Sequence, residues 1–135
     1  MTKLEAKVRR ARRIFIIGNG GSYANAVHLC NDLLGVGKPA FTLDAATLTA
    51  TANDFGYEEV YRRWISVVGA RGDLLLALSG SGRSANVRAA IAEARKRGME
   101  WHLFTDSHTS LDMQASEEAQ LLAGHNLMRS LRAKR

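Results

Sequence analysis

Short, unbroken apolar runs alternate with stretches of helical periodicity along this sequence. Ile14–Ile17 and Leu74–Leu78 are such runs, and each is followed by glycines. Runs of this length and composition are typical of parallel strands buried on both faces of a sheet. Residues 22–34 and 85–97 come next in each case, with apolar positions at helical spacing. This alternation predicts strand–helix–strand units and an α/β fold.

The remainder of the chain continues the pattern. Further predicted elements are strands at Pro39–Leu43 and Trp101–Thr105 and helices over 2–12, 58–68 and 111–131. A length of 135 residues is ordinary for one domain. We therefore predict a single domain over 1–135, a three-layer α/β/α sandwich with a mostly parallel sheet of four or five strands. Residues 1–13 form a basic N-terminal helix or arm in this interpretation, and 111–132 form the closing helix.

The positive charge of the chain is concentrated at its two ends. The net charge is +6, and residues 1–13 and 129–135 together hold ten bases and one acid. The central part is therefore mildly acidic. A basic patch requires the two ends to meet, within one chain or across an oligomer, and we interpret them instead as solvated helical ends. Direct binding of nucleic acid is not expected.

The cysteine content and the hydropathy indicate a cytoplasmic protein. Cys30 is the only cysteine, so an intramolecular disulfide is excluded, and we interpret it as a small buried hydrophobic residue. No stretch reaches the roughly 18 to 20 apolar residues that span a bilayer, and the N-terminus is charged. No membrane partner is expected.

Two glycine-rich turns follow predicted strands. Gly18–Ser22 allows backbone amides to approach an anion beside a helix N-terminus. A dinucleotide fingerprint requires glycine where Tyr23 stands, so no nucleotide cofactor is expected. Ser79–Ser84 has three hydroxyls and lacks the lysine of a P-loop, which suits a phosphoester; taken alone, it also fits a flexible turn capped by Ser84. Both turns fall where a parallel sheet binds ligands, beyond the carboxyl ends of its strands.

Three segments carry a resemblance to a known family. Ile16–Ser22, Ala52–Tyr57 and Gly72–Asn86 resemble, in this order, the SIS (sugar isomerase) domain family and its phosphoheptose isomerase branch. The resemblance implies a sheet flanked by helices and a homotetramer with ligand sites at subunit contacts. It also implies enediol aldose–ketose isomerisation of sedoheptulose 7-phosphate to D-glycero-D-manno-heptose 7-phosphate. A relative in that branch binds the bacterial replication initiator, so a non-catalytic phosphosugar sensor or regulator is the alternative.

The resemblance also implies which residues bind the substrate. These are Asn19, Gly20, Ser22, Asn53, Asp54, Ser79, Ser81 and Ser84, with the last three as phosphate ligands. Gly80 and Arg83 depart from the family's usual Ser-Thr-Ser-Gly-Asn-Ser. Losing the threonine hydroxyl removes at most one hydrogen bond, about 1 kcal/mol. Arg83 either adds charge to the phosphate site or points to solvent, and phosphate binding is expected in both cases.

The expected catalytic residues are Asp32 and His125, which the resemblance matches to the family's catalytic glutamate and histidine. Isomerisation through an enediol needs a base and an acid of this kind. His28 and Asp32 are also i and i+4, so they share one helix face, although a solvated pair is the simpler interpretation without the family. Aspartate in place of glutamate shortens the reach, and a misplacement of this order costs about a hundredfold in rate.

The resemblance further implies a metal site with zinc as the candidate ion and His28, Asp32, Glu117 and His125 as ligands. Glu117 and His125 lie about 12 Å apart along a regular helix, so one chain does not easily offer both to one ion. Only residues 106–116 stand where the family has a loop, a fifth strand and a second loop. We expect the fifth strand to be missing.

Overall fold

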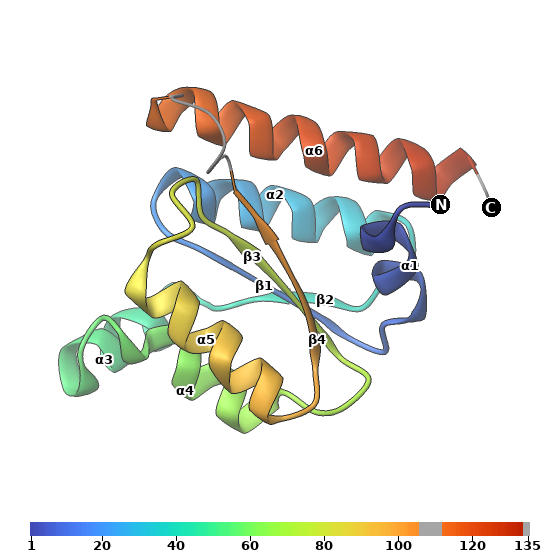
Figure 1. Cartoon of the computed structure of the whole chain (residues 1–135). Helices are drawn as coiled ribbons and strands as arrows, with labels where there is room; N and C mark the ends of the chain where they lie inside the picture. The colour runs from blue at the N-terminus through green and yellow to red at the C-terminus, as the bar shows by residue number, and fades with distance from the viewer. Residues whose placement is uncertain (106–111, 134–135) are drawn as a thin grey trace.

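The computed structural model describes residues 1–105 and 112–133, and its centre is a sheet of four parallel strands (Figure 1). The strands are β1 (Ile14–Gly18), β2 (Ala40–Thr42), β3 (Leu74–Leu78) and β4 (Glu100–Phe104), in the order β2-β1-β3-β4. In the register of the central strands, Ile14 pairs with Leu74, which pairs with Glu100. The predicted fold class, with four strands in the described part of the chain, is confirmed.

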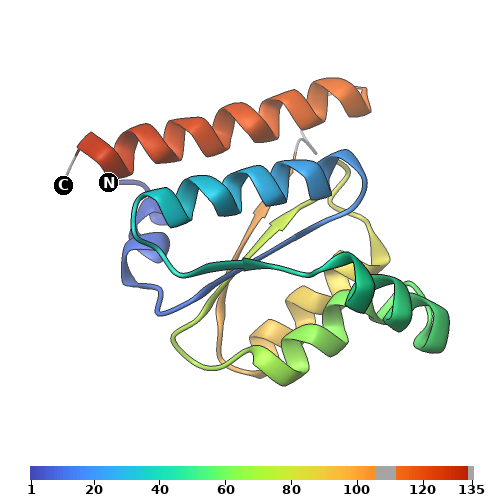
Figure 2. The same ribbon diagram turned by 180° about the vertical axis from the view of Figure 1, so that it is seen from behind.

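Helices cover both faces of the sheet (Figures 1 and 2). One face carries α1 (Lys3–Arg10), α2 (Gly21–Gly35) and α6 (Met113–Ala133), and the other carries α4 (Glu59–Val68) and α5 (Ala85–Lys96), with α3 (Ala45–Phe55) beyond them. Every residue of β1 and β3 is buried. Because successive side chains of a strand point to opposite faces, Ile16 joins one core and Ile17 the other.

One helix, α3, was not predicted from the sequence. None of its residues is buried, so it lacks the apolar stripe by which the other helices were found. Its boundaries nevertheless have clear signals. The Asp44 carboxylate accepts a hydrogen bond from the Thr47 amide at 2.8 Å, and Gly56 ends the helix with φ of 99°.

The two basic ends of the chain meet in the structure. The Glu5 carboxylate in α1 accepts hydrogen bonds from Arg9 Nε at 3.0 Å and from Ser130 Oγ at 2.6 Å. Arg9 Nη2 in turn donates to the backbone oxygens of Ser130 and Leu131, at 3.5 and 3.4 Å. Figure 1 shows the N-terminus and the last turn of α6 close together beside α1. A basic patch requires these two ends to meet, and in the structure they do.

Three smaller expectations concern single segments. Cys30 is buried and burial raises the pKa of its thiol, which confirms its interpretation as a small hydrophobic residue. No helix within 1–105 or 112–133 is long and apolar enough to cross a membrane. The expected loss of a fifth strand in 106–116 lies mostly outside the described residues, and 113–116 is the first turn of α6.

Candidate active site

The serine loop joins β3 to α5 as a tight turn. Ser79 follows the last residue of β3, and Ser84 directly precedes α5. The Ser79 hydroxyl lies 3.2 Å from that of Ser84 and accepts a hydrogen bond from the Gly82 amide at 3.2 Å. Gly82 has φ of +68°, which only glycine adopts readily. The loop thus gathers hydroxyls at a helix N-terminus, where the helix dipole favours an anion.

Asn19 in the first glycine turn is held by two neighbours. Its side-chain amide exchanges two hydrogen bonds with that of Asn86 in α5, at 2.8 and 2.9 Å. The Tyr57 hydroxyl also donates to Asn19 Oδ1, at 2.9 Å. Beneath the turn, the buried Tyr61 hydroxyl donates to the Gly18 carbonyl, and burial raises the Tyr61 pKa so that it remains a donor. These bonds fix the first turn against the serine loop.

Both turns line one cavity of about 310 Å³. Six of the eight residues predicted to bind substrate lie in its wall, namely Asn19, Gly20, Ser22, Ser79, Ser81 and Ser84. Asn53 and Asp54 do not: both are exposed on α3, where the Asn53 amide donates to the Asp54 carboxylate at 3.0 Å. A single chain therefore assembles the phosphate end of the predicted site without its α3 residues.

Gly80 has a packing role that the sequence did not show. A Cβ at this position would lie 2.9 Å from Cβ of Ser116 in α6, which is closer than two carbons pack. The threonine usual in the family would therefore push α6 away from the loop. Arg83 is exposed and does not line the cavity, and only its backbone amide bonds the loop, to Ser81 Oγ at 3.1 Å.

Glu117 lies at the cavity and not beside His125. It is part of the cavity wall, and its carboxylate fills the space that a Cβ at Gly21 would occupy. Gly21 is the first residue of α2. The Glu117 carboxylate therefore lies in the same cavity as the serine loop. The structure thus separates Glu117 from the other three predicted metal ligands.

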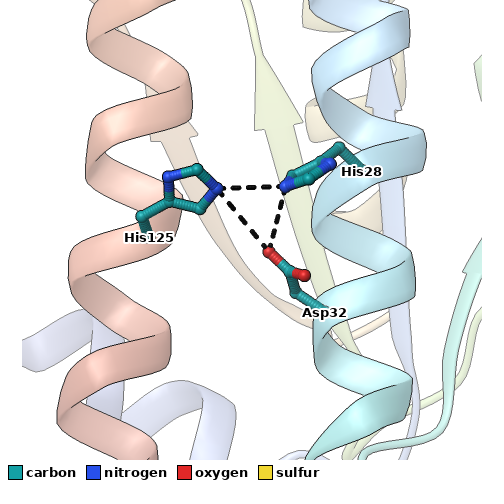
Figure 3. A group of neighbouring side chains, drawn as sticks. All are labelled: His28, Asp32 and His125. Atoms are coloured by element: carbon teal, nitrogen blue, oxygen red, sulfur yellow. Dashed lines mark hydrogen bonds and ion pairs between the residues drawn. The ribbon is translucent and has the colours of Figure 1, made fainter.

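Those three residues form a cluster between α2 and α6 (Figure 3). His28 Nε2 lies 3.0 Å from His125 Nε2 and 3.3 Å from Asp32 Oδ2. His125 Nε2 lies 4.0 Å from the same carboxylate oxygen. The histidine side chains are 48% and 40% exposed, so the cluster is open to solvent on one side. Atoms bound to zinc at about 2.0 to 2.1 Å in a tetrahedron are about 3.3 Å apart, so these three atoms fit such an ion.

The cluster lines a narrow gap of its own. This gap and the 310 Å³ cavity both have Leu78 in their walls, but His28, Asp32 and His125 are not part of the larger cavity. The serine-lined cavity and the cluster of His28, Asp32 and His125 are therefore neighbours in one chain.

Gln120 links the two sites, and the sequence analysis missed it. Its buried Oε1 accepts hydrogen bonds from Ser22 Oγ and from Asn25 Nδ2, both at 3.1 Å. Asn25 Nδ2 also donates to the Glu117 backbone oxygen at 2.8 Å. Gln120 Nε2 is buried without a partner among the described residues. A polar residue within the apolar stripe of a helix was the available signal, because buried polar side chains are normally hydrogen-bonded.

Replacement of Gln120 by leucine is expected to destabilise the protein by about 1 to 2 kcal/mol, because Ser22 loses its buried acceptor and Asn25 loses one of two. Urea unfolding monitored by circular dichroism measures this change. The matched control is Gln114→Leu, at an exposed position of the same helix, which is expected to change stability little. Equal stability of Gln120→Leu and wild type would contradict this role.

Sequence comparison places the chain among sugar isomerases. Residues 2–101 match the SIS domain. The chain is 40% identical over 114 residues to a phosphoheptose isomerase of Bradyrhizobium sp. (strain BTAi1), across 78% of this chain and 58% of that protein. It is 47% identical over 96 residues to that of Halorhodospira halophila, across 65% and 48%. It is 32% identical over 142 residues to that of Burkholderia pseudomallei, across 89% and 72%. The chain thus spans about half the length of several curated relatives.

Solved structures agree with this placement. A phosphoheptose isomerase from Neisseria gonorrhoeae superposes with a TM-score of 0.88 at 26% identity, over 96% of this chain and 81% of that chain. One from Francisella tularensis has a TM-score of 0.82 at 23% identity, over 96% and 84%, and shows the shared fold.

Proposed function

The chain belongs to the SIS-domain family, in its phosphoheptose isomerase branch, and from this we propose that it is an aldose–ketose isomerase of a seven-carbon sugar phosphate. The proposed substrate is sedoheptulose 7-phosphate and the proposed product is D-glycero-D-manno-heptose 7-phosphate. The observation that carries this proposal is the serine-lined cavity with an acid–base cluster beside it. The relatives are named as isomerases, so the alternative of a non-catalytic regulator is not favoured.

The phosphate group occupies the serine loop in this proposal. Ser79, Ser81 and Ser84 offer hydroxyls, and the N-terminus of α5 offers backbone amides and the positive end of its dipole. No lysine among the described residues lines the cavity. Binding through hydroxyls and amides suits a phosphate that must also leave with the product.

The length of α2 suits a long substrate. Ser22 and His28 are six residues apart, about 9 Å along the helix axis, which is comparable to the length of an extended seven-carbon sugar phosphate. With the phosphate on the serine loop, in the same cavity as Ser22, the first two carbons extend towards the cluster. Asp32 then takes a proton from one of these carbons and returns it to the other, while His125 Nε2 moves a proton between their oxygens.

We propose zinc as the ion of the cluster, held by His28 Nε2, Asp32 Oδ2 and His125 Nε2. Their spacing of 3.0 to 4.0 Å and their chemistry suit it. When bound, the ion would occupy the lone pair of His125 Nε2 and would polarise the substrate oxygens as a Lewis acid, in place of proton transfer by that nitrogen. Glu117 is not included, because it lies at the other site.

Assembly into a homotetramer is proposed as well. Asn53 and Asp54 are outside the cavity of their own chain, and α3 buries no residue. An α3 supplied by a neighbouring subunit would complete the sugar end of the site. We also propose a cytoplasmic location, consistent with the buried thiol of the lone Cys30, and no nucleotide cofactor, since Tyr23 interrupts the fingerprint.

The experiment that tests the proposed function is incubation of the purified chain with sedoheptulose 7-phosphate, with the aldose product followed by NMR. The binding step is tested separately by calorimetric titration. Ser81→Ala is expected to weaken binding about tenfold or more, because a hydrogen bond to a charged phosphate contributes about 1.5 to 3 kcal/mol.

Two further variants sharpen the titration. Glu117→Gln is expected to tighten binding, because it removes a negative charge that faces the phosphate. Ser66→Ala, on α4 and away from the cavity, is the matched control and is expected to bind as wild type does. Absence of binding in wild type, or equal binding by Ser81→Ala and wild type, would refute the assignment of the phosphate site.

A further inference from the structure

Most of the basic side chains gather at the end of the molecule where the strands begin. Thirteen lie in α1, in the segments that lead into the strands, and at the last turns of α5 and α6: Lys3, Lys7, Arg9, Arg10, Arg12, Arg13, Lys38, Arg71, Arg95, Lys96, Arg97, Arg129 and Arg132. We call this surface the basic end. The acids among the same segments are Glu5, Asp73, Glu93 and Glu100.

Contacts between these segments join the basic end into one surface. Arg9 of α1 bonds the end of α6, and Lys38 Nζ donates to the Arg9 backbone oxygen at 2.8 Å. Arg97 Nε donates to the Gly69 carbonyl at 2.8 Å, which links the end of α5 to the segment before β3. The Arg10–Glu100 ion pair joins these two groups, so the cations of five segments that are distant in sequence share one end of the molecule.

Three of the four acids of the basic end pair with arginines within 1–105 and 112–133, the exception being Glu93. Asp73 is buried and pairs with Arg13 at 2.7 Å and with Arg12 at 3.5 Å. Glu5 pairs with Arg9, and Glu100 with Arg10.

Five exposed cations of this surface have no side-chain hydrogen bond or ion pair within the described part of the chain: Lys3, Arg71, Arg95, Lys96 and Arg132. The opposite end of the molecule holds Asp44, Glu58, Glu59, Glu117 and Glu118. The charge is thus separated along the strand direction, and the basic end presents a positive field to a partner.

We propose that the basic end binds the phosphate backbone of double-stranded DNA without sequence preference. Nine of its thirteen cations are arginines, whose planar guanidinium groups form bidentate hydrogen bonds with phosphate oxygens. Release of counterions from a duplex supplies the binding energy for such a surface.

Two other polyanions fit the basic end less well. Membrane-surface binding by α1 would need free apolar side chains, but Val8 is fully buried and Leu4 packs against the core. Single strands bind by stacking on exposed aromatic rings. The exposed aromatic residues of the described chain, Phe41, Phe55 and Tyr57, lie in β2 and around the end of α3.

This proposal reverses the expectation from the sequence that nucleic acid is not bound directly. That expectation depended on two separate solvated ends, and in the structure the ends meet. The basic end lies opposite the carboxyl edge that carries the 310 Å³ cavity, so the proposal does not rest on the proposed isomerase activity.

The test is fluorescence anisotropy with a labelled 20-base-pair duplex of arbitrary sequence. If about five phosphates are neutralised, affinity is expected to fall by about 10² to 10³ between 50 and 200 mM salt. The variant Arg95→Gln/Lys96→Gln/Arg132→Gln is expected to reduce the slope of log affinity against log salt by about 3. The matched control is Arg62→Gln/Arg63→Gln/Arg88→Gln, which removes the same charge elsewhere and is expected to keep the wild-type slope.

Each other outcome overturns the proposal. These are no binding by wild type at 50 mM salt, an equal loss in both triple variants, or binding to phosphatidylserine-containing vesicles with none to the duplex. Circular dichroism checks that the variants fold. If the first triple variant does not fold, Lys3→Gln/Arg71→Gln is measured in the same way, with an expected slope reduction of about 2.

Discussion

Replacement of His125 by alanine is expected to lower kcat for sedoheptulose 7-phosphate by about 10²- to 10⁴-fold, the range for loss of a general acid–base group. His125 Nε2 lies 3.0 Å from His28 Nε2 and 4.0 Å from Asp32 Oδ2. The substitution removes a proton carrier and also one of three atoms that suit an ion. Stopped assays with product detection by NMR measure the change.

The same variant should change KM little. His125 is not part of the cavity that holds the serine loop, so the phosphate is expected to bind as before. Loss of kcat at constant KM indicates an interaction made in the transition state. Asp32→Asn is expected to behave in the same way. Asp32→Glu, which restores the longer reach of the family's residue, is expected to retain turnover or to raise it.

His102→Ala is the matched control, since this histidine packs edge-on against the Phe104 ring outside the cluster. It is expected to keep the wild-type kcat. Unchanged turnover in His125→Ala would remove His125 from the mechanism. A loss of equal size in His102→Ala would indicate that histidine removal acts through stability and not through chemistry.

The sequence could predict those parts of the fold whose residues are buried. β1 and β3 are buried along their whole length, so their unbroken apolar runs predicted the strands of the sheet. Helices α2 and α5 were predicted from apolar residues at helical spacing. Helix α3 was not predicted because none of its residues is fully buried: only Leu48 and Ala52 pack partly against the core, and its capping residues are the clearest signal. Periodicity detects burial, and a helix without burial carries no such pattern.

Within the site, local motifs were predictable and contacts between distant segments were not. The serine loop and the i, i+4 pair of His28 and Asp32 are defined by neighbours in sequence. The positions of Glu117 and Gln120 depend on how α6 lies against α2, which no local pattern specifies. The fit of Gly80 beneath Ser116 has the same origin. The rise of a regular helix correctly predicted that Glu117 and His125 do not bind one ion together. It did not show that Glu117 lies at the serine-lined cavity and His125 beside His28 and Asp32.

The hydrogen bond between Glu5 of α1 and Ser130 near the C-terminal end of α6 is the basis of the second prediction with a large expected effect. Replacement of Glu5 by alanine is expected to lower the free energy of unfolding by about 3 to 5 kcal/mol, the range for breaking a buried ion pair. Glu5 is 1% exposed and binds both Arg9 of its own helix and Ser130 of α6. The midpoint of thermal unfolding is expected to fall by about 10 °C or more for a domain of this size.

Two variants separate the buried contact from surface charge. Ser130→Ala removes one hydrogen bond to Glu5 and is expected to cost about 1.5 to 3 kcal/mol, since the bond is to a charged group. Glu100→Ala breaks the exposed pair with Arg10 and is expected to shift the unfolding midpoint little. Similar losses in Glu5→Ala and Glu100→Ala would show that burial at the junction of α1 and α6 is not the cause. α6 also carries His125. If loss of the contact between α1 and α6 loosens α6, turnover by Ser130→Ala should fall as the temperature approaches the unfolding midpoint of this variant.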